Sequence, residues 1–255
     1  MKEPTVSLLP KPSKILLIGD SCYDEYHYGD INRISPEAPV PVLDMDRSVI
    51  KRGMAYNVFQ NLVNLGATVH IVTEFSETKH RYLDNKTGQQ LLRVDEKIKK
   101  KFIDTADETM DDYDAVVISD YNKGFFTYED IKKIRNNYVG PIFVDTKKPD
   151  LAKFDGCFVK INQYEYEART SDTDDLIVTY GSKKVTYKNR TYIPPKVDAY
   201  DVCGAGDTFL SSLAYKYCED YNMDEAIKFA MLAASVTVQN IGVYAPTLKE
   251  IGNAS

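Results

Sequence analysis

Hydrophobic residues in this chain occur in short continuous runs, and the segments between several of these runs carry apolar residues at helical spacing. Short apolar runs bounded by glycine, proline or charged residues are typical of strands buried on both faces of a sheet. Their alternation with helices predicts an α/β fold with a mostly parallel central sheet. The predicted strands are residues 15–18, 68–73, 115–118, 141–144, 157–159 and 176–178.

The helical periodicity is clearest where every third or fourth residue is apolar and a glycine, Gly66, ends the pattern. Glycine directly after a periodic segment is a common C-terminal stop signal. Near the end of the chain, two further amphipathic patterns follow each other closely, so we expect those two helices to pack together. The predicted helices are residues 54–65, 128–135, 163–169, 209–217 and 223–238.

Residues 22–49 interrupt the alternation of strands and helices. Aromatic residues stand at near-alternate positions there, followed by three prolines and an extended apolar run. This pattern suits exposed β-structure and predicts a small β lid, after a first strand that ends at Gly19-Asp20. A long surface loop is the alternative, although structureless loops of this length are uncommon in compact domains.

Composition narrows the class of protein. A chain of 255 residues suits one domain, residues 1–255, that buries a core of its own. The 32 basic residues are scattered and outnumbered by 38 acidic ones, which argues against a nucleic-acid partner. No apolar stretch is long enough for a membrane span, and the four cysteines form no CxxC pair, so we expect reduced thiols and a cytoplasmic location.

The segment with the clearest chemistry is residues 201–207, at the expected start of a helix. In open α/β sheets, a glycine-rich turn that enters a helix leaves backbone N–H groups available to an anion. Gly204, Ala205 and Gly206 would supply these donors to a phosphoryl group in transfer, and Asp207 would accept the proton of an attacking hydroxyl. A simple tight turn with a helix-capping carboxylate is the alternative reading of these four residues.

The wider sequence context favours the catalytic interpretation. Residues 201–209, DVCGAGDTF, resemble the C-terminal signature of the ribokinase (PfkB) family of carbohydrate kinases. Residues 162–165, NQYE, are similar to the NxxE motif of that family, and residues 178–181, VTYG, to its strand end beside the nucleotide. The resemblance implies a ribokinase-like three-layer sandwich with ATP and Mg²⁺ as cofactors. The implied catalytic residues are Asp207, Gly204, Ala205 and Gly206, and the implied nucleotide-side residues are Thr179, Gly181, Asn162 and Glu165, the last two reaching Mg²⁺ through water.

A narrower resemblance covers nearly the whole chain. Residues 33–42, RISPEAPVPV, resemble the kinase domain of bacterial ADP-heptose synthesis proteins, and so do residues 89–95, 119–124 and 144–147 in the same order. This resemblance implies ATP-dependent phosphorylation of D-glycero-D-manno-heptose 7-phosphate to the 1,7-bisphosphate. Two alternatives stay open, a kinase of the same fold for another sugar or nucleoside, and a catalytically impaired binding or regulatory descendant.

Several polar residues are candidates for contact with a phosphorylated sugar. Hydroxyl groups would bond to a carboxylate and an amide, and phosphates would bond to cations just past the strand ends or on the lid. A solvated surface role is the alternative for each lysine. The candidates are Asp24, Arg33, Gly53, Asn57, Lys123 and Lys147.

Other features modify this picture. Asp201 either shapes the turn or helps to hold a monovalent cation, as in some relatives, and the lid is a candidate surface for a homodimer. Gly53-Met54 stands where the family usually has two glycines, and Gly181 lacks the second glycine of the usual pattern, which motivates the impaired-descendant alternative. The three histidines have no metal-ligand spacing, so the sequence predicts packing or surface roles for them.

Overall fold

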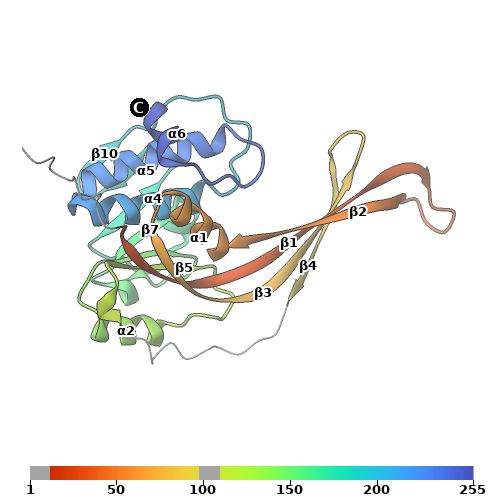
Figure 1. Ribbon diagram of the computed structural model, residues 1–255. Coiled ribbons are helices and arrows are strands. Elements are labelled where there is room, and N and C mark those ends of the chain that lie inside the picture. Colours follow the sequence, from red (N-terminus) through yellow and green to blue (C-terminus); the bar gives the residue numbers. More distant parts are fainter. Residues whose placement is uncertain (1–11, 98–109, 255) are drawn as a thin grey trace, which may run out of the picture.

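The computed structural model describes residues 12–97 and 110–254, and these form a single twisted sheet with helices on both faces (Figure 1). The strands are β1 (Lys14–Ile34), β2 (Pro41–Met54), β3 (Thr68–Asp84), β4 (Gln90–Lys97), β5 (Ala115–Asp120), β6 (Ile142–Thr146), β7 (Phe158–Asn162), β8 (Leu176–Thr179), β9 (Val185–Tyr187) and β10 (Arg190–Tyr192). The helices are α1 (Ala55–Asn64), α2 (Tyr128–Asn137), α3 (Gln163–Ala168), α4 (Ala205–Asp220), α5 (Met223–Val238) and α6 (Leu248–Asn253), with short 3₁₀ turns at Met110–Asp112 and Leu151–Phe154.

The order of the strands across the sheet is β10-β9-β8-β7-β6-β5-β1-β3-β4, with β2 paired to the outer part of β1. The strands from β3 through β1 and β5 to β8 are parallel, while β4, β2, β9 and β10 join antiparallel at the margins. This arrangement confirms the predicted α/β architecture with a mostly parallel central sheet. Because parallel strands all end at the same edge, it also gathers the loops that follow β5, β6 and β7.

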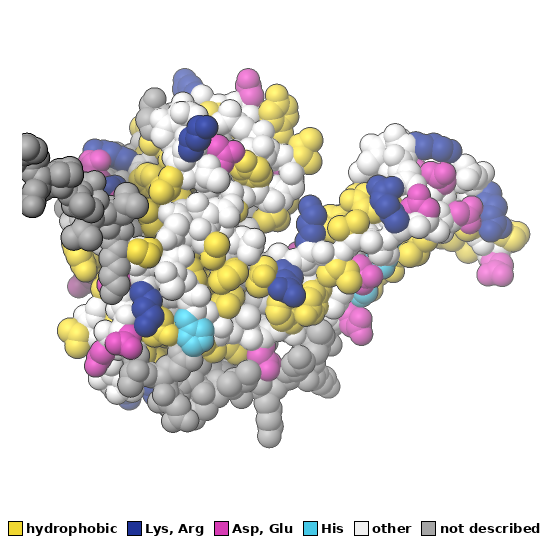
Figure 2. Space-filling model, viewed as in Figure 1, with side chains coloured by type: hydrophobic (Ala, Val, Ile, Leu, Met, Phe, Trp, Pro, Cys, Tyr) yellow, Lys and Arg dark blue, Asp and Glu magenta, His cyan; other side chains and the backbone are white. Residues whose placement is uncertain are grey.

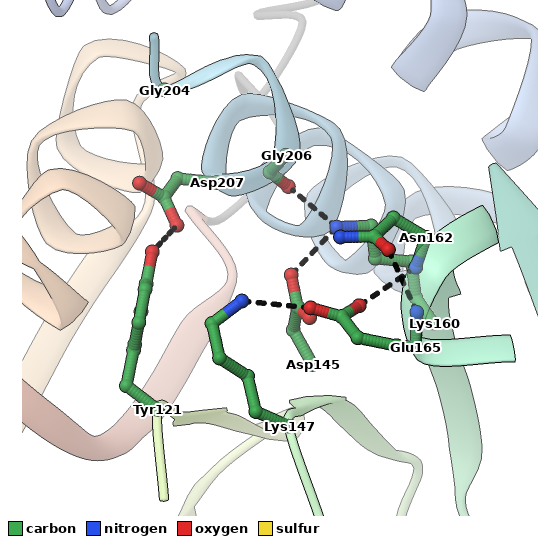
Figure 3. Close-up of a pocket in the computed structure, with 9 residues that line it drawn as sticks. All are labelled: Tyr121, Asp145, Lys147, Lys160, Asn162, Glu165, Gly204, Gly206 and Asp207. Atoms are coloured by element: carbon green, nitrogen blue, oxygen red, sulfur yellow. Dashed lines mark hydrogen bonds and ion pairs between the residues drawn. The ribbon is translucent and has the colours of Figure 1, made fainter. Parts of the chain in front are cut away.

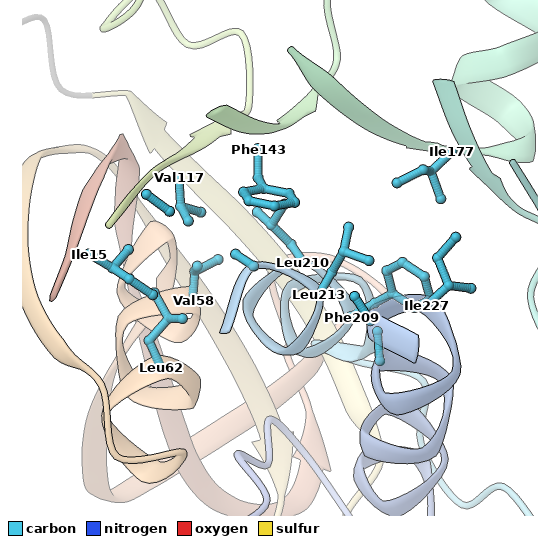
Figure 4. Close-up of a cluster of buried hydrophobic side chains, with 14 of the residues drawn as sticks. Ile15, Val58, Leu62, Val117, Phe143, Ile177, Phe209, Leu210, Leu213 and Ile227 are labelled. Carbon is cyan, nitrogen blue, oxygen red and sulfur yellow. The ribbon is translucent and has the colours of Figure 1, made fainter. Parts of the chain in front are cut away.

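Alternate residues of the central strands fill two separate cores. In β1, Ile15 and Leu17 face one core with α1, α4 and α5, whereas Leu16 and Ile18 face the other with α2. Figure 4 shows the first core, in which Leu210 and Leu213 of α4 pack toward the sheet. Complete burial on both faces explains why these strands are continuous apolar runs in the sequence.

The first strand does not end at Gly19-Asp20, which corrects the sequence-based prediction. β1 continues past these two residues to Ile34 and is 21 residues long in total. Gly19 is required because a Cβ there would lie 2.2 Å from the carbonyl oxygen of Ser119 on β5. Asp20 is fully buried, and its carboxylate accepts the N–H of Tyr121 at 2.9 Å. Both residues therefore belong to the sheet and not to a loop.

The outer half of β1 enters a curved β extension that projects from the helical body (Figure 1). We call residues 22–54 and 76–97 the lid. The segment 22–49, predicted to form the main part of the lid, lies in it as β-structure, and β3 and β4 contribute two further strands. Hydrophobic, basic and acidic side chains are interspersed along the face of the lid drawn in Figure 2. Among the described residues, no helix combines the length and the apolar character needed to cross a bilayer.

Candidate active site

The start of α4 forms one wall of the candidate site. Gly204 precedes the helix with φ +79°, a conformation that favours glycine, and a Cβ there would lie 2.8 Å from Nδ2 of Asn57. At Gly206, a Cβ would lie 3.0 Å from Nζ of Lys160. The glycines thus let polar side chains from α1 and β7 approach the helix end. The first-turn N–H groups of a helix have no carbonyl partner within the helix, which makes this end suited to an anion.

Asp207 lies in the first turn of α4 and is buried. Asn57 Nδ2 donates to Oδ2 at 2.7 Å, and the hydroxyl of Tyr121 donates to Oδ1 at 2.9 Å. Burial raises the pKa of Asp207 to about 6, although both hydrogen bonds favour the charged form. Each carboxylate oxygen keeps a second lone pair, so this side chain is able to accept a proton from a third group. Asn57, predicted to bind substrate, therefore also orients the candidate base.

The ends of β6 and β7 face Asp207 across a pocket (Figure 3). Asn162 and Glu165 form a reciprocal capping box at the start of α3, with Asn162 Oδ1 accepting the N–H of Glu165 at 3.0 Å. Lys147 Nζ lies 2.7 Å from Oε1 of Glu165. Burial disfavours a charged lysine, but the hydrogen bond that Lys147 donates to Glu165 and the negative charges of the surrounding carboxylates together outweigh burial and raise the pKa of Lys147. The structure thus brings Lys147, Asn162 and Glu165 together with Asp207.

A partly buried ion pair in this pocket was missed by the sequence analysis. Lys160 Nζ lies 2.6 Å from Oδ2 of Asp145 and 3.4 Å from the carbonyl oxygen of Gly206. A lysine inside an apolar strand, with Asp at the end of the neighbouring strand, was the available signal. The pair links β6 and β7 to the first turn of α4, and so it fixes the distance between the pocket walls.

On the lid side, Asp24 of β1 is buried against the guanidinium group of Arg81 on β3, with Nη2 to Oδ1 at 2.9 Å. A Cβ on Gly53 would lie only 2.5 Å from Oδ2 of Asp24, so glycine provides the space for this carboxylate. The predicted substrate residues Asp24 and Gly53 are therefore neighbours. Arg81 was not predicted, because its partner is 57 positions away in the chain.

Lys123 is held by a second acidic residue of the lid. Its Nζ lies 2.8 Å from Oε2 of Glu77, whose other oxygen lies 3.2 Å from Nζ of Lys79. Burial opposes ionisation of Glu77, but the bonds from the two lysines outweigh it and lower the pKa of that carboxyl group. The two lysines and the single carboxylate of Glu77 together carry a net positive charge. This charge lies near Cys22 and Asp24, because Lys79 also donates to Cys22 Sγ at 3.4 Å.

Three further predicted residues, Arg33, Thr179 and Gly181, take no part in the contacts described above. Arg33 is exposed and lies one residue before the end of β1, where the β1–β2 hairpin turns back. This hairpin projects away from the helical body (Figure 1). Thr179 is the register partner of Asn162, and its hydroxyl donates to the carbonyl oxygen of Ile161 at 3.3 Å. Gly181 follows in an exposed turn with φ +58°. Thr179 therefore lies beside the pocket residue Asn162, whereas neither Gly181 nor Arg33 lines the pocket.

Asp201 shapes the loop before α4. Its oxygens accept the N–H groups of Cys203 and Gly242, each at 2.9 Å, and these backbone bonds lower the pKa of Asp201. These two hydrogen bonds support the alternative in which Asp201 shapes the turn.

Met54, which stands where the family usually has a second glycine, adopts φ +63° and ψ −126°. L-residues rarely occupy this region of backbone conformation, so the methionine costs backbone strain.

Comparison with protein families matches residues 81–250, two thirds of the chain, to the pfkB family carbohydrate kinase. A bifunctional protein HldE from Nitratiruptor sp. is 32% identical over 93% of this chain, and one from Aliarcobacter butzleri is 30% identical over 96% of it. The chain spans 64% of the length of each of these relatives.

Solved structures of similar shape extend the comparison to the fold. A ribokinase from Thermotoga maritima superposes with a TM-score of 0.68 at 18% identity, covering 95% of this chain and 99% of the other. Phosphofructokinase-2 from Escherichia coli in complex with potassium gives a TM-score of 0.72 at 16% identity, covering 95% and 98%. At these identities the agreement concerns the fold.

Proposed function

Since this chain belongs to the pfkB family and is a carbohydrate kinase, we propose that it phosphorylates a sugar phosphate, D-glycero-D-manno-heptose 7-phosphate, to the 1,7-bisphosphate with ATP as donor. The observation that carries the proposal is the buried Asp207 at the start of α4, facing cations across one pocket. The HldE relatives and the resemblance of residues 33–42 support the choice of a heptose.

In the proposed reaction, the sugar hydroxyl attacks the γ-phosphorus, a new O–P bond forms, and the bond to the bridging oxygen of ADP breaks. Asp207 accepts the hydroxyl proton through a lone pair not used by Asn57 or Tyr121. The N–H groups at the start of α4, around Gly204, Ala205 and Gly206, stabilise negative charge on the transferred group. Removal of water by the lid would strengthen these interactions.

The residues opposite Asp207 fit an ATP–Mg²⁺ complex. Lys147 is a point charge for a phosphate oxygen, and carboxylate and amide oxygens suit a hard cation. Both oxygens of Glu165 already accept bonds, from Lys147 and from the N–H of Asn162 at 2.8 Å, so contact with Mg²⁺ through water suits this site better than direct ligation. The bound ion would neutralise phosphate charge. A monovalent cation beside Asp201 would have to share its carboxylate with two backbone bonds.

The sugar phosphate is assigned to the space between Asp207 and the lid. Asp24 would accept bonds from sugar hydroxyls, while Lys123, beside Lys79 and Glu77, would bind the phosphate. Arg33 approaches such a substrate only if the distal part of the lid folds inward. Gly53 contributes by leaving room for Asp24.

Exposed apolar side chains on the β1–β2 hairpin support a homodimer through the lid as part of this proposal. They are Ile34, Val40, Met45, Val49 and Ile50. The outer edge of β2 and that of β4 are the free margins of the lid sheet in the described chain. Light scattering of the purified protein should give twice the chain mass. A monomeric mass at micromolar concentration would refute the homodimer.

Replacement of Tyr121 by Phe is expected to shift the pH profile of kcat/KM. The hydroxyl of Tyr121 favours the charged form of Asp207, whose pKa is about 6, so its loss raises that pKa further. The acid limb of the profile should therefore move to higher pH. Tyr138→Phe is the matched control, because that hydroxyl bonds to the carbonyl oxygen of Tyr113 instead. An unchanged acid limb in Tyr121→Phe would argue against Asp207 as the titrating group.

Replacement of Gly53 by Ala is expected to raise KM for the sugar phosphate roughly tenfold, with little change in KM for ATP. The new methyl group would meet Asp24 Oδ2 at 2.5 Å and force this carboxylate to rotate while Arg81 holds its other oxygen. Gly252→Ala is the control, because no atom lies within 4 Å of its Cβ position. Equal effects on both KM values would place Asp24 outside the sugar site.

A substrate panel tests the proposed function itself. ADP release should depend on D-glycero-D-manno-heptose 7-phosphate and exceed the rates with fructose 6-phosphate, ribose and nucleosides. A different preferred acceptor would refute the heptose and retain the kinase. Binding of ATP and sugar phosphate without turnover by any acceptor would favour the impaired descendant, for which the strained Met54 is the specific motive.

A further inference from the structure

Three potential metal ligands from two lid strands converge on one point. Nε2 of His27 lies 3.0 Å from Nδ1 of His80 and 3.8 Å from Oε2 of Glu25, and the last two atoms are 3.2 Å apart. Glu25 and His27 are two positions apart on β1, so both project from the same face. His80 is the register partner of Glu25 on β3. The triad therefore results from strand pairing, although His27 and His80 are 53 residues apart in the chain.

These distances suit a tetrahedral transition-metal site. With bonds of about 2.0–2.1 Å to a zinc ion, ligand atoms lie roughly 3.3 Å from one another. The three separations of 3.0, 3.2 and 3.8 Å bracket that value. A single proton between the two imidazoles would leave the carboxylate of Glu25 facing a nitrogen lone pair, whereas a cation interacts favourably with all three atoms.

The outer nitrogen of each imidazole also has a partner that is compatible with the required tautomer. Glu96 Oε2 lies 3.4 Å from Nε2 of His80, and because a carboxylate only accepts, it favours the proton on Nε2 and a lone pair on Nδ1. Ser48 Oγ lies 2.8 Å from Nδ1 of His27, where it is able to accept that N–H. Metal-binding histidines usually donate their second N–H in this way. His27 is buried and stacks on Tyr82 with ring centroids 4.7 Å apart.

We propose that Glu25, His27 and His80 bind a divalent transition-metal ion, with Zn²⁺ as the best fit and water in the fourth position. Imidazole and carboxylate ligands select such ions over Mg²⁺. The ion would join β1 to β3 directly and, through Ser48 and Glu96, engage β2 and β4. Asp24 precedes Glu25 and faces the opposite side of the sheet. The ion thus fixes the lid behind the sugar-binding face without contacting substrate.

Calorimetric titration of ZnCl₂ into the chelator-treated 255-residue chain tests this site directly. The wild-type protein should bind one equivalent, and CoCl₂ in its place should produce the visible absorption of tetrahedral cobalt. His27→Gln and His80→Gln should each weaken binding at least 100-fold, while Ser48→Ala and Glu96→Gln should weaken it roughly 10-fold. His70→Gln is the control, because His70 lies on the same strand β3 outside the triad, beside Tyr113. It should bind as wild type does.

Thermal unfolding with and without ZnCl₂ provides a second measurement. The midpoint should rise with zinc concentration for wild type and His70→Gln, and this rise should be absent in His80→Gln. If a histidine variant fails to fold, Glu25→Gln replaces it, since the amide keeps the shape and removes the anionic ligand. Absence of stoichiometric binding by wild type, or binding unaffected by the triad substitutions, would overturn the proposal and leave a hydrogen-bonded histidine pair.

Discussion

Asp207→Asn is expected to lower kcat by 10²- to 10⁴-fold at pH 8, the usual contribution of a positioned general base. The amide cannot take the proton of the attacking hydroxyl, yet it keeps the size of the carboxylate. Asn57 still finds a carbonyl acceptor, and the hydroxyl of Tyr121 is able to turn and accept from the new N–H group. KM values for ATP and sugar phosphate should change much less than kcat.

The stability of this variant provides its control. The pKa of Asp207 is about 6 in the folded chain, above its ordinary value of 3.8, because of burial. Between pH 3.8 and 6 the folded state retains a proton that the unfolded chain releases, so the stability contributed by this group falls as the pH rises through that range. Above pH 6 the loss is constant, about 3 kcal/mol at most. Asp207→Asn removes this cost, so its free energy of unfolding at pH 8 should equal or exceed that of wild type. A variant that folds and keeps full turnover would exclude Asp207 as the base.

The arrangement of the central sheet was predictable because its strands are buried on both faces. Short continuous apolar runs, such as those at residues 115–118 and 141–144, favour buried strands over other structures. Both of these runs form parallel strands, β5 and β6. The lid was less predictable. In residues 74–84, charged side chains alternate with others, and Glu77 and Arg81 find partners, Lys123 and Asp24, far away in the chain. Ion pairs of this kind arise from tertiary structure, so a local pattern does not indicate them.

The same difference separates the predicted and the missed residues of the candidate site. Asp207, Asn162 and Lys147 stand next to turns or strand ends, where the topology of a parallel sheet requires them to meet. Lys160 lies within an apolar strand, a signal that was available in the sequence, but its ion pair with Asp145 follows from the pairing of β6 and β7. The roles of Asp207 in proton transfer and of Lys147 in phosphate binding are predictions, which Asp207→Asn and Lys147→Met test.

Substitution by Met should have different effects on two adjacent lysines: it should reduce catalysis at Lys147 and stability at Lys148. Lys148 Nζ lies 2.7 and 2.6 Å from the two oxygens of Asp120, and the side chains of this pair are 9% and 0% exposed. Burial, followed by the charge of Asp120, raises the pKa of nearby Asp20, so removal of the lysine would leave two buried carboxyl groups facing each other. The Lys147 side chain is 44% exposed.

Lys148→Met should lower the free energy of unfolding by about 3–5 kcal/mol at pH 8, the cost of a buried charge without its partner, and reduce the midpoint by roughly 6–20 °C. The deficit should shrink toward pH 5, because protonation of one carboxyl group relieves the repulsion. Lys147→Met should change stability by less than about 1 kcal/mol. Its kcat/KM should instead fall roughly 10- to 100-fold, as expected for one lost charged contact to phosphate.

Thermal and denaturant unfolding, measured beside steady-state kinetics for both variants, separates the two roles. The substrate whose KM rises in Lys147→Met identifies the phosphate that this lysine binds, a point that its salt bridge to Glu165 leaves open. A strong loss of stability in Lys147→Met with normal kinetics would assign Lys147 to the scaffold. Wild-type stability in Lys148→Met would mean that water reaches Asp120, in conflict with its burial between β1 and β6.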